Sequence, residues 1–211
     1  MGLIIKRLLF LSSLCIFIIA DSKAQSFQQN SENSIEFNRM VNIYHSWNGP
    51  NDPVYNGREY ERYAFYISNG LPYFVTDTLV NAKMVYDGIQ YNQTPLLYDL
   101  VVDELITKSY DGKKLIKLVK QKVDSFNLNG AQFISIHHGN KDMPEGYYRV
   151  LHDGNTLVLK KEVRRIENDI KYGEQLQKNV KSKVTYYIKE KDQYRKVNNN
   201  SAIKYYDQLT Q

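Results

Sequence analysis

The chain has 211 residues, of which 42% are hydrophobic, 24% charged and 13% aromatic. The apolar fraction excludes a disordered chain, and 11 glycines with 5 prolines exclude a collagen-like one. The composition is typical of a globular protein with one domain, or with two only if both are small.

Residues 1–24 have the features of a secretory signal peptide. Lys6 and Arg7 form a short positive segment, an apolar run follows from Leu8 to Ala20, and small residues precede a cleavage site after Ala24. The apolar run is shorter than the about 20 residues that a membrane-spanning helix needs. We therefore predict export, with no transmembrane segment after cleavage. The alternative is a short N-terminal anchor that stays uncleaved.

The mature chain, residues 25–211, contains no cysteine, because Cys15 lies in the signal segment. Disulfides, thiol catalysis and thiolate metal sites are therefore excluded. The mature chain keeps 25 of the 28 basic and 22 of the 23 acidic residues, so its net charge is +3. A charge this small predicts no nucleic-acid partner.

Residues 25–33 are polar and lack periodicity, which predicts a flexible lead-in. A helix is expected over about 34–47, where apolar side chains recur at the three- and four-residue spacing of one helix face. The breaker cluster 48–53, with two prolines and a glycine, ends this helix. We predict that residues 34–211 form a single β-rich domain whose strands occupy about 58–197.

Four dipeptides separate runs that are rich in β-branched and aromatic residues: Asp87-Gly88, Asp111-Gly112, Asn129-Gly130 and Asp153-Gly154. Such pairs tolerate the positive φ that short hairpin turns need. They recur 18 to 24 residues apart, which corresponds to one hairpin for each pair. The predicted fold is therefore mainly β, an antiparallel meander that forms a curved sheet or open barrel.

Two stretches between these turns are less regular. Leu96–Lys108 is too long for one flat strand, so we expect a bulge or turn at Asp103-Glu104. Leu115–Val123 fits either a short helix or a strand, and the close spacing of the flanking turns favours a strand.

The end of the mature chain is the most polar part. The charge-rich stretch from Lys160 to Lys183 is interpreted as a long strand followed by a mobile loop. A last hairpin is expected around Lys191-Asp192. Asn198–Ser201 then predict the cap of a short helix over about 201–209.

Five short motifs occur in a characteristic order: Val54–Tyr60, Leu71–Phe74, Val85–Tyr91, Pro95–Leu100 and Gly146–Gly154. From about Met40 to Leu209 this succession resembles a family of uncharacterised exported proteins of Gram-negative bacteria. The resemblance implies a location in the periplasm or outer cell envelope, and association with outer-membrane transport receptors. It implies no activity, ligand or catalytic residue.

The histidines give one suggestive arrangement, the pair His137-His138. Adjacent residues of a strand point to opposite faces, so this pair ligates one metal ion only if it lies in a loop, with Asp142 nearby. His45 and His152 are single and distant in sequence. We predict no metal site and no cofactor.

Catalytic motifs are equally weak, because the sequence contains no G-x-S-x-G, H-E-x-x-H, S-x-x-K or P-loop pattern. Asp99, Asp103 and Glu104 are the acidic set that a glycosidase would use. If Asp99 and Asp103 lie on one strand, they are about 13 Å apart, too far for either glycosidase geometry. We interpret them as outward polar positions of an amphipathic strand, and we predict no catalytic residue.

Tyrosine is the strongest compositional bias, with 18 in the chain. The doublets Tyr147-Tyr148, Tyr186-Tyr187 and Tyr205-Tyr206 each direct one ring inward and one outward if they are extended. Stacking between strands accounts for the outward rings, and a binding patch for peptides or sugars is the alternative.

These observations favour a non-enzymatic, exported envelope protein. We expect it to bind a protein partner, such as an outer-membrane protein, through an edge strand or a tyrosine-rich face. One alternative is a carrier that holds a small apolar or glycan ligand within the curved sheet. A weaker alternative is a hydrolase that uses Asp103, Glu104 or His137.

Overall fold

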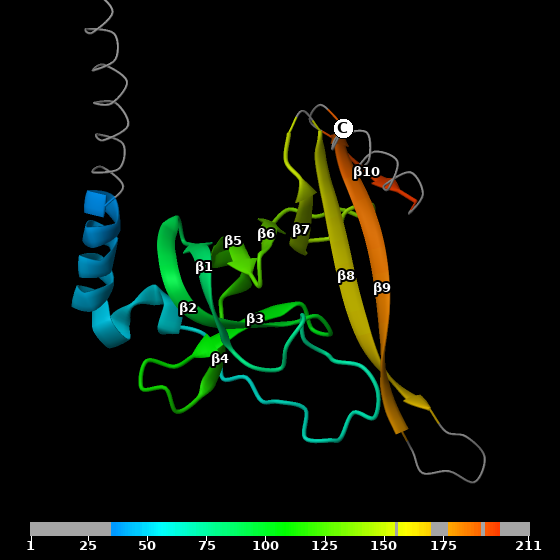
Figure 1. Cartoon of the computed structure of the whole chain (residues 1–211), viewed down its shortest axis with the longest axis horizontal. Helices are drawn as coiled ribbons and strands as arrows, with labels where there is room; N and C mark the ends of the chain where they lie inside the picture. The colour runs from blue at the N-terminus through cyan, green and yellow to red at the C-terminus, as the bar shows by residue number, and fades with distance from the viewer. Residues whose placement is uncertain (1–34, 155, 170–176, 191–192, 199–211) are drawn as a thin grey trace, which may run out of the picture. The chain divides into compact units, whose positions relative to one another are not determined.

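The computed structural model describes residues 35–154, 156–169, 177–190 and 193–198. The chain divides into two compact units, residues 1–48 and 49–211 (Figure 1). The first contains the predicted helix, which occupies residues 35–48. No helix in the described ranges is long and apolar enough to cross a membrane. The predicted signal segment, the lead-in and the C-terminal helix lie outside the described residues.

The second unit is mainly β. Its described residues include three short 3-10 helices, η1 (Gly49–Asn51), η2 (Pro53–Tyr55) and η3 (Lys120–Lys122). The strands are β1 (Val80–Tyr86), β2 (Ile89–Asp99), β3 (Glu104–Lys108), β4 (Leu115–Lys117), β5 (Val123–Leu128), β6 (Ala131–Ile136), β7 (Gly146–His152), β8 (Leu157–Asp169), β9 (Gln177–Glu190) and β10 (Gln193–Val197).

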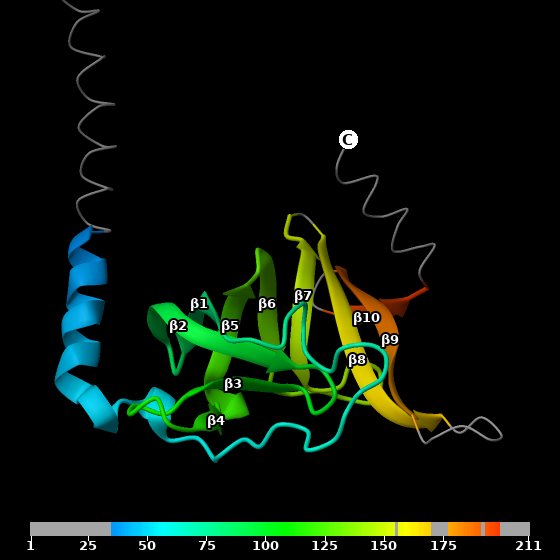
Figure 2. The same ribbon diagram turned by 60° about the horizontal axis from the view of Figure 1, so that its bottom comes forward.

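These strands form one open antiparallel sheet in the order β10-β9-β8-β7-β6-β5-β1-β2-β3-β4. The predicted mainly-β fold is confirmed, with one interruption of the meander, because β5 pairs with β1 instead of β4. The sheet curls (Figure 2), and the turn after β2 reaches β8, where the Arg164 N–H donates to the Leu100 carbonyl at 2.9 Å. That bond joins the turn after β2 to a strand that is far from β2 in the sheet order.

The four predicted turn pairs all lie between strands. Asp87-Gly88 and Asn129-Gly130 are two-residue hairpin loops, because the residues that flank each pair are partners across the two strands. Both pairs have positive φ at each position, as short hairpin loops require. Asp111-Gly112 and Asp153-Gly154 lie in longer loops instead.

Two stretches differ from the pattern expected from the sequence. The strands begin at Val80 rather than near residue 58, and isolated bridges of Glu59, Asn69 and Tyr73 hold the preceding stretch to the sheet. The stretch from Leu115 to Val123 is divided between β4, η3 and the start of β5. The predicted turn near Asp103-Glu104 is confirmed, because β2 ends at residue 99 and β3 begins at residue 104.

The inside of the curl is filled by aromatic rings. Phe126 and Phe133 stack with centroids 4.7 Å apart, and Tyr98 and Tyr147 meet Phe126 edge to face at 5.6 and 5.2 Å. The Phe74 ring completes the cluster and meets the Phe133 ring edge to face, with 5.1 Å between the ring centroids. These contacts come from four strands and one loop, so the same cluster sets the curvature and excludes water.

The tyrosine doublet of β7 alternates as predicted, but neither ring is exposed. Tyr147 belongs to the aromatic cluster inside the curl, whereas Tyr148 points to the opposite face. There Met143, Leu159 and Tyr187 pack around it. Tyr148 meets Tyr187 edge to face at 5.4 Å, which fits the predicted stacking of the outward ring rather than an exposed binding patch at this doublet.

Phe126→Ala is expected to lower the free energy of unfolding by about 3–5 kcal/mol, because it leaves a cavity among three other rings. Urea denaturation followed by circular dichroism measures this loss. Phe65→Ala removes the same atoms from a residue that is 40% exposed, and we expect it to cost less than about 1 kcal/mol. Equal losses in the two variants would contradict the assignment of Phe126 to the core.

Candidate functional site

Asp99, the last residue of β2, is fully buried, contrary to the outward orientation predicted for it. Its Oδ2 accepts hydrogen bonds from the hydroxyls of Tyr60 and Tyr63, at 2.7 and 2.9 Å. Its Oδ1 accepts the Val101 N–H at 2.8 Å, as in an Asx turn. The prediction was wrong because β2 ends here, so the strand alternation on which it relied stops.

The two tyrosines are held as hydrogen-bond donors. Burial, then its hydrogen bonds to Tyr73 and Asp99, raise the pKa of Tyr60. Burial and the hydrogen bond to Asp99 likewise raise the pKa of Tyr63. Both phenols therefore stay protonated and tie the irregular segment that contains them to the end of β2.

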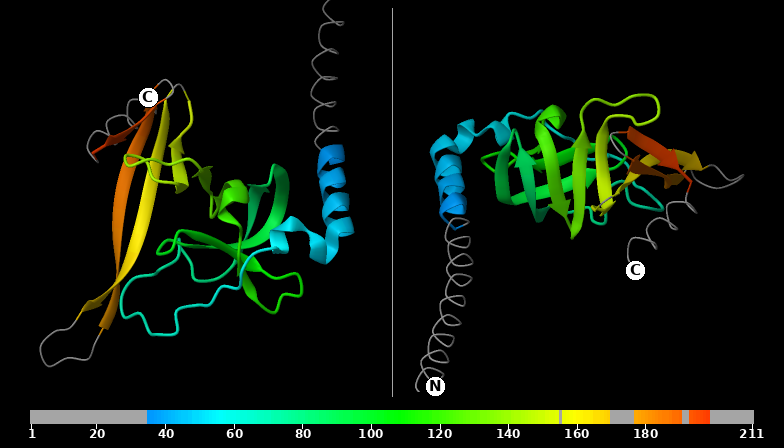
Figure 3. Two further views of the ribbon diagram at one scale, coloured as in Figure 1. Left: turned by 180° about the vertical axis from the view of Figure 1, so that it is seen from behind. Right: turned by 90° about the horizontal axis from the view of Figure 1, so that it is seen from above.

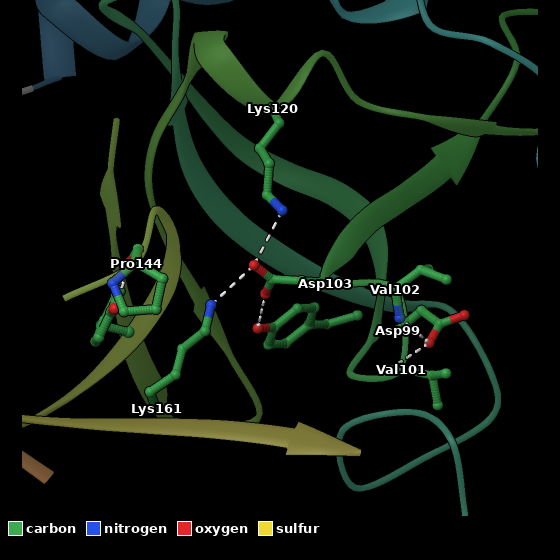
Figure 4. Close-up of polar contacts among 9 residues, drawn as sticks. Asp99, Val101, Val102, Asp103, Lys120, Pro144 and Lys161 are labelled. Carbon is green, nitrogen blue, oxygen red and sulfur yellow. Dashed lines mark hydrogen bonds and ion pairs between the residues drawn. The ribbon is translucent and has the colours of Figure 1, made fainter. Parts of the chain in front are cut away.

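Asp103 forms the polar centre of what we call the Asp103 cluster, together with Lys120, Lys161 and Tyr98. Its Oδ2 accepts hydrogen bonds from the Nζ atoms of Lys161 and Lys120, at 2.8 and 2.9 Å. The Tyr98 hydroxyl donates to Oδ1 at 2.6 Å. The two lysines reach the carboxylate from β8 and η3 (Figure 4). The side chain of Asp103 is only 19% exposed, so its predicted outward orientation was also wrong.

The backbone at Gly146, the first residue of β7, lies against the same ion pair. A Cβ atom here would overlap both the Asp103 carboxylate and the Lys161 ammonium. Gly146 also has a φ of +130°, which L side chains rarely adopt. Only glycine therefore allows β7 to start at this point while the two charges meet.

The side chain of Lys161 is buried, with only 7% of it exposed. Burial lowers the pKa of Lys161, although the neighbouring Asp103 carboxylate opposes that effect. The ammonium also lies over the Tyr148 ring, 5.0 Å from its centroid. Burial raises the pKa of Tyr98 well above its usual value, and the charge of Asp103 adds to this.

A lysine with a lowered pKa is the kind of group that serves as a base or a nucleophile in enzymes. Here its ammonium lies against the backbone of β7 at Gly146 and over the Tyr148 ring, and its hydrogen bond goes to a carboxylate of the same chain. A reacting molecule therefore has no direct approach to it. We interpret the Asp103 cluster as the structural joint between the β2–β3 turn, η3 and β8.

In the described ranges, the residues considered for a hydrolase do not form one hydrogen-bonded set. His137 follows β6, and its Nε2 lies 4.0 Å from Asp124 Oδ1 rather than beside Asp103. Glu104 begins β3 half-buried, and burial raises its pKa. In the described ranges, no group of three or more His, Cys, Asp or Glu residues is placed to hold a metal ion.

Sequence reasoning missed three members of the Asp103 cluster, Tyr98, Lys120 and Lys161. The two lysines come from elements that are distant in the chain, and Tyr98 reaches Asp103 only because the chain turns after β2. A sequence signal for Lys161 is its place in β8, where it continues the alternation of Leu157 and Leu159. That position points into the sheet by strand alternation, and a buried lysine requires a carboxylate partner.

Two adjacent exposed aromatic residues lie in the irregular stretch before β1, whereas the exposed Tyr110 lies in the loop between β3 and β4. Tyr66 is 84% and Phe65 40% exposed. The Nζ of Lys178, on β9, lies 4.5 Å from the Phe65 ring centroid, and Tyr63 contacts the same ring at 5.6 Å. We call residues 63–66 the aromatic segment.

Comparison of the chain with models of known protein families, with curated proteins and with solved structures finds no match. The assignment of a function therefore depends on the geometry of the molecule itself.

Asp103→Asn is expected to lower the free energy of unfolding by about 3 kcal/mol at pH 7, because it leaves the buried Lys161 ammonium without its counter-charge. Urea denaturation at pH 7 measures the change. Glu104→Gln is the matched control, one residue along the chain. It removes a charge that is costly to bury, so we expect a change within about 0.5 kcal/mol or a slight stabilisation. If Asp103→Asn leaves the free energy of unfolding unchanged, the structural role of the cluster is refuted.

The deficit of Asp103→Asn should shrink as the pH rises from 7 to about 9, below the range in which free tyrosines titrate. Burial lowers the folded-state pKa of Lys161, so between that pKa and the ordinary lysine value the unfolded chain binds more protons and stability rises with pH. Asp103→Asn removes the carboxylate that opposes this lowering, so in the variant the rise of stability begins at a lower pH. Denaturation series of both proteins give the difference, and a deficit that stays constant with pH would contradict this assignment.

Proposed function

We propose that the protein is a non-enzymatic binding module of the Gram-negative cell envelope, and that it recognises a protein partner through the aromatic segment. The observation that carries the proposal is the exposure of Phe65 and Tyr66 on a stretch that is fixed at both ends. Exposed aromatic side chains are enriched at protein interfaces, where they add contact area at a low cost in entropy.

The segment is preorganised by contacts on both sides. Before it, Tyr63 is bonded to the buried Asp99, and Arg62 donates to the Asp77 carbonyl at 2.8 Å. After it, Ser68 N–H donates to the Lys178 carbonyl at 2.9 Å. A fixed segment loses little freedom when a partner binds, which favours recognition over mere exposure.

Two further considerations support this function over its alternatives. The inside of the curl is filled by the rings around Phe126, which leaves the carrier hypothesis without the space that it needs. His137 lies beside Asp124, and in the described residues it has no bond to the adjacent pair Asp103 and Glu104, so the hydrolase hypothesis has no assembled set of groups. The envelope location rests on the signal-like residues 1–24 and on the resemblance of the five sequence motifs.

The experiment is in-cell crosslinking of the tagged full chain, expressed with its own N-terminal segment in a Gram-negative bacterium. We expect one dominant envelope protein, and a loss of at least about fivefold in its yield for Phe65→Ala/Tyr66→Ala. The control is Val102→Ala/Tyr110→Ala, which removes two other exposed side chains, 46% and 57% exposed. Recovery of cytoplasmic partners, or equal losses in both double variants, would refute the proposal.

A further inference from the structure

The outer edge of β9 is covered along only part of its length. β10 pairs with residues 186–190 of β9, and the stretch 68–70 lies beside residues 178–180, in parallel through the bridge of Asn69 with Asn179. Between these covered stretches lie residues 181–185, which pair with β8 on their inner side. Figure 3 shows β8 and β9 as a long two-stranded hairpin.

Two hydrogen bonds show which backbone groups face this edge. Arg164 N–H points away from β9, to the Leu100 carbonyl, so its partner Ser182 also directs its N–H and C=O away from β8. The Val180 N–H donates outward to the Asn69 carbonyl at 2.8 Å. Because backbone groups alternate along a strand, every second residue after Val180 also directs its N–H outward. Ser182 and Val184 therefore present their backbone donors and acceptors to the open edge, with no strand of the described chain opposite them.

The side chains beside this edge are basic. Arg165, Lys181 and Lys183 are all exposed. Arg165 is the cross-strand partner of Lys181, and Val163 that of Lys183, so the three cations share one face of the hairpin. Within the described ranges none of the three makes an ion pair. Like charges placed opposite each other are destabilising, and an acidic ligand would relieve that repulsion.

Lysines on an edge strand also serve to prevent aggregation, and that simpler explanation competes with binding. Two observations favour binding. The other edge of the sheet, at β4, is covered by the chain itself, through Tyr60 N–H to Leu115 and Lys117 N–H to Arg58. The open stretch of β9 is instead continuous with the aromatic segment, because Lys178 contacts Phe65 just before the edge becomes free.

We infer that residues 181–185 of β9 receive an extended, acidic segment of a partner protein as an added β-strand. This deepens the proposed function and rests on it. The partner backbone bonds to Ser182 and Val184, and its carboxylates lie against Arg165, Lys181 and Lys183. Gly70 limits the added strand on one side, because its backbone abuts the side chain of Val180.

The decisive variant is Val184→Pro, which removes one outward N–H and leaves every charge in place. Proline is tolerated in a strand when its nitrogen faces an open edge, and circular dichroism with thermal melting checks the fold. A second variant, Lys181→Glu/Lys183→Glu, reverses the charges. Its control is Lys83→Glu/Lys108→Glu, the same change at two other exposed strand lysines.

The probe is a fluorescein-labelled peptide of about eight residues that alternates Glu and Thr, compared with one that alternates Lys and Thr. We expect the acidic peptide alone to bind in fluorescence anisotropy at low salt. Val184→Pro and Lys181→Glu/Lys183→Glu should each weaken it by about tenfold or more, and the control double variant by less than about twofold. Hydrogen exchange should show new protection at the Ser182 and Val184 amides.

Other outcomes overturn the inference. If Val184→Pro binds the acidic peptide as the wild type does, or if no protection appears at Ser182, the attraction is only charge and no strand is added. Binding to anionic vesicles is measured as well, and binding that Val184→Pro leaves unchanged would indicate a lipid surface and not an added strand. In the crosslinking experiment, full yield with Val184→Pro but loss with Phe65→Ala/Tyr66→Ala would refute the added strand alone, whereas full yield with both would refute the proposed function as well.

Discussion

The burial of Asp103 between two lysines is the interaction on which the rest of the β unit depends. The carboxylate sits in the turn between β2 and β3, and Lys161 comes from β8, which is far from β2 in the sheet order. Their hydrogen bond, beside the Arg164 N–H to Leu100 bond, holds the sheet in its curl. A buried ion pair adds little net stability over apolar packing, but it tolerates only one arrangement of its partners. It therefore defines which strand meets the turn.

The curl in turn gives the irregular stretch 56–79 its place. The Arg164 guanidinium donates to the carbonyls of Leu71 and Tyr73, both at 2.7 Å, so the residue that meets the β2 turn through its backbone also holds this stretch through its side chain. Arg164 is balanced by Glu162. Burial alone raises the pKa of Glu162, but hydrogen bonds from Arg164 and Lys160 outweigh it and lower the pKa. The stretch that contains the exposed aromatic segment is therefore held in place by charged, hydrogen-bonded side chains.

The local features of this fold were predictable and the long-range ones were not. Asp87-Gly88 and Asn129-Gly130 define hairpins because their positive φ is a property of the residues themselves. The burial of Asp103 was missed because it depends on Lys120 and Lys161, which lie 17 and 58 residues along the chain. Strand alternation also failed where a turn begins, as at Asp99. A period-two pattern describes residues only while the strand continues.

The lack of regular structure between residues 56 and 79 follows from what the stretch must connect. Near Glu59 it pairs antiparallel with β4, whereas near Asn69 it runs parallel to β9 (Figure 1). β4 is an end strand of the sheet and β9 is next to the other end. The stretch meets each of these strands at one isolated bridge, so it forms no continuous ladder with either of them. The residues between the two bridges have no ladder to bury them, and this is why Phe65 and Tyr66 are left at the surface beside an open edge.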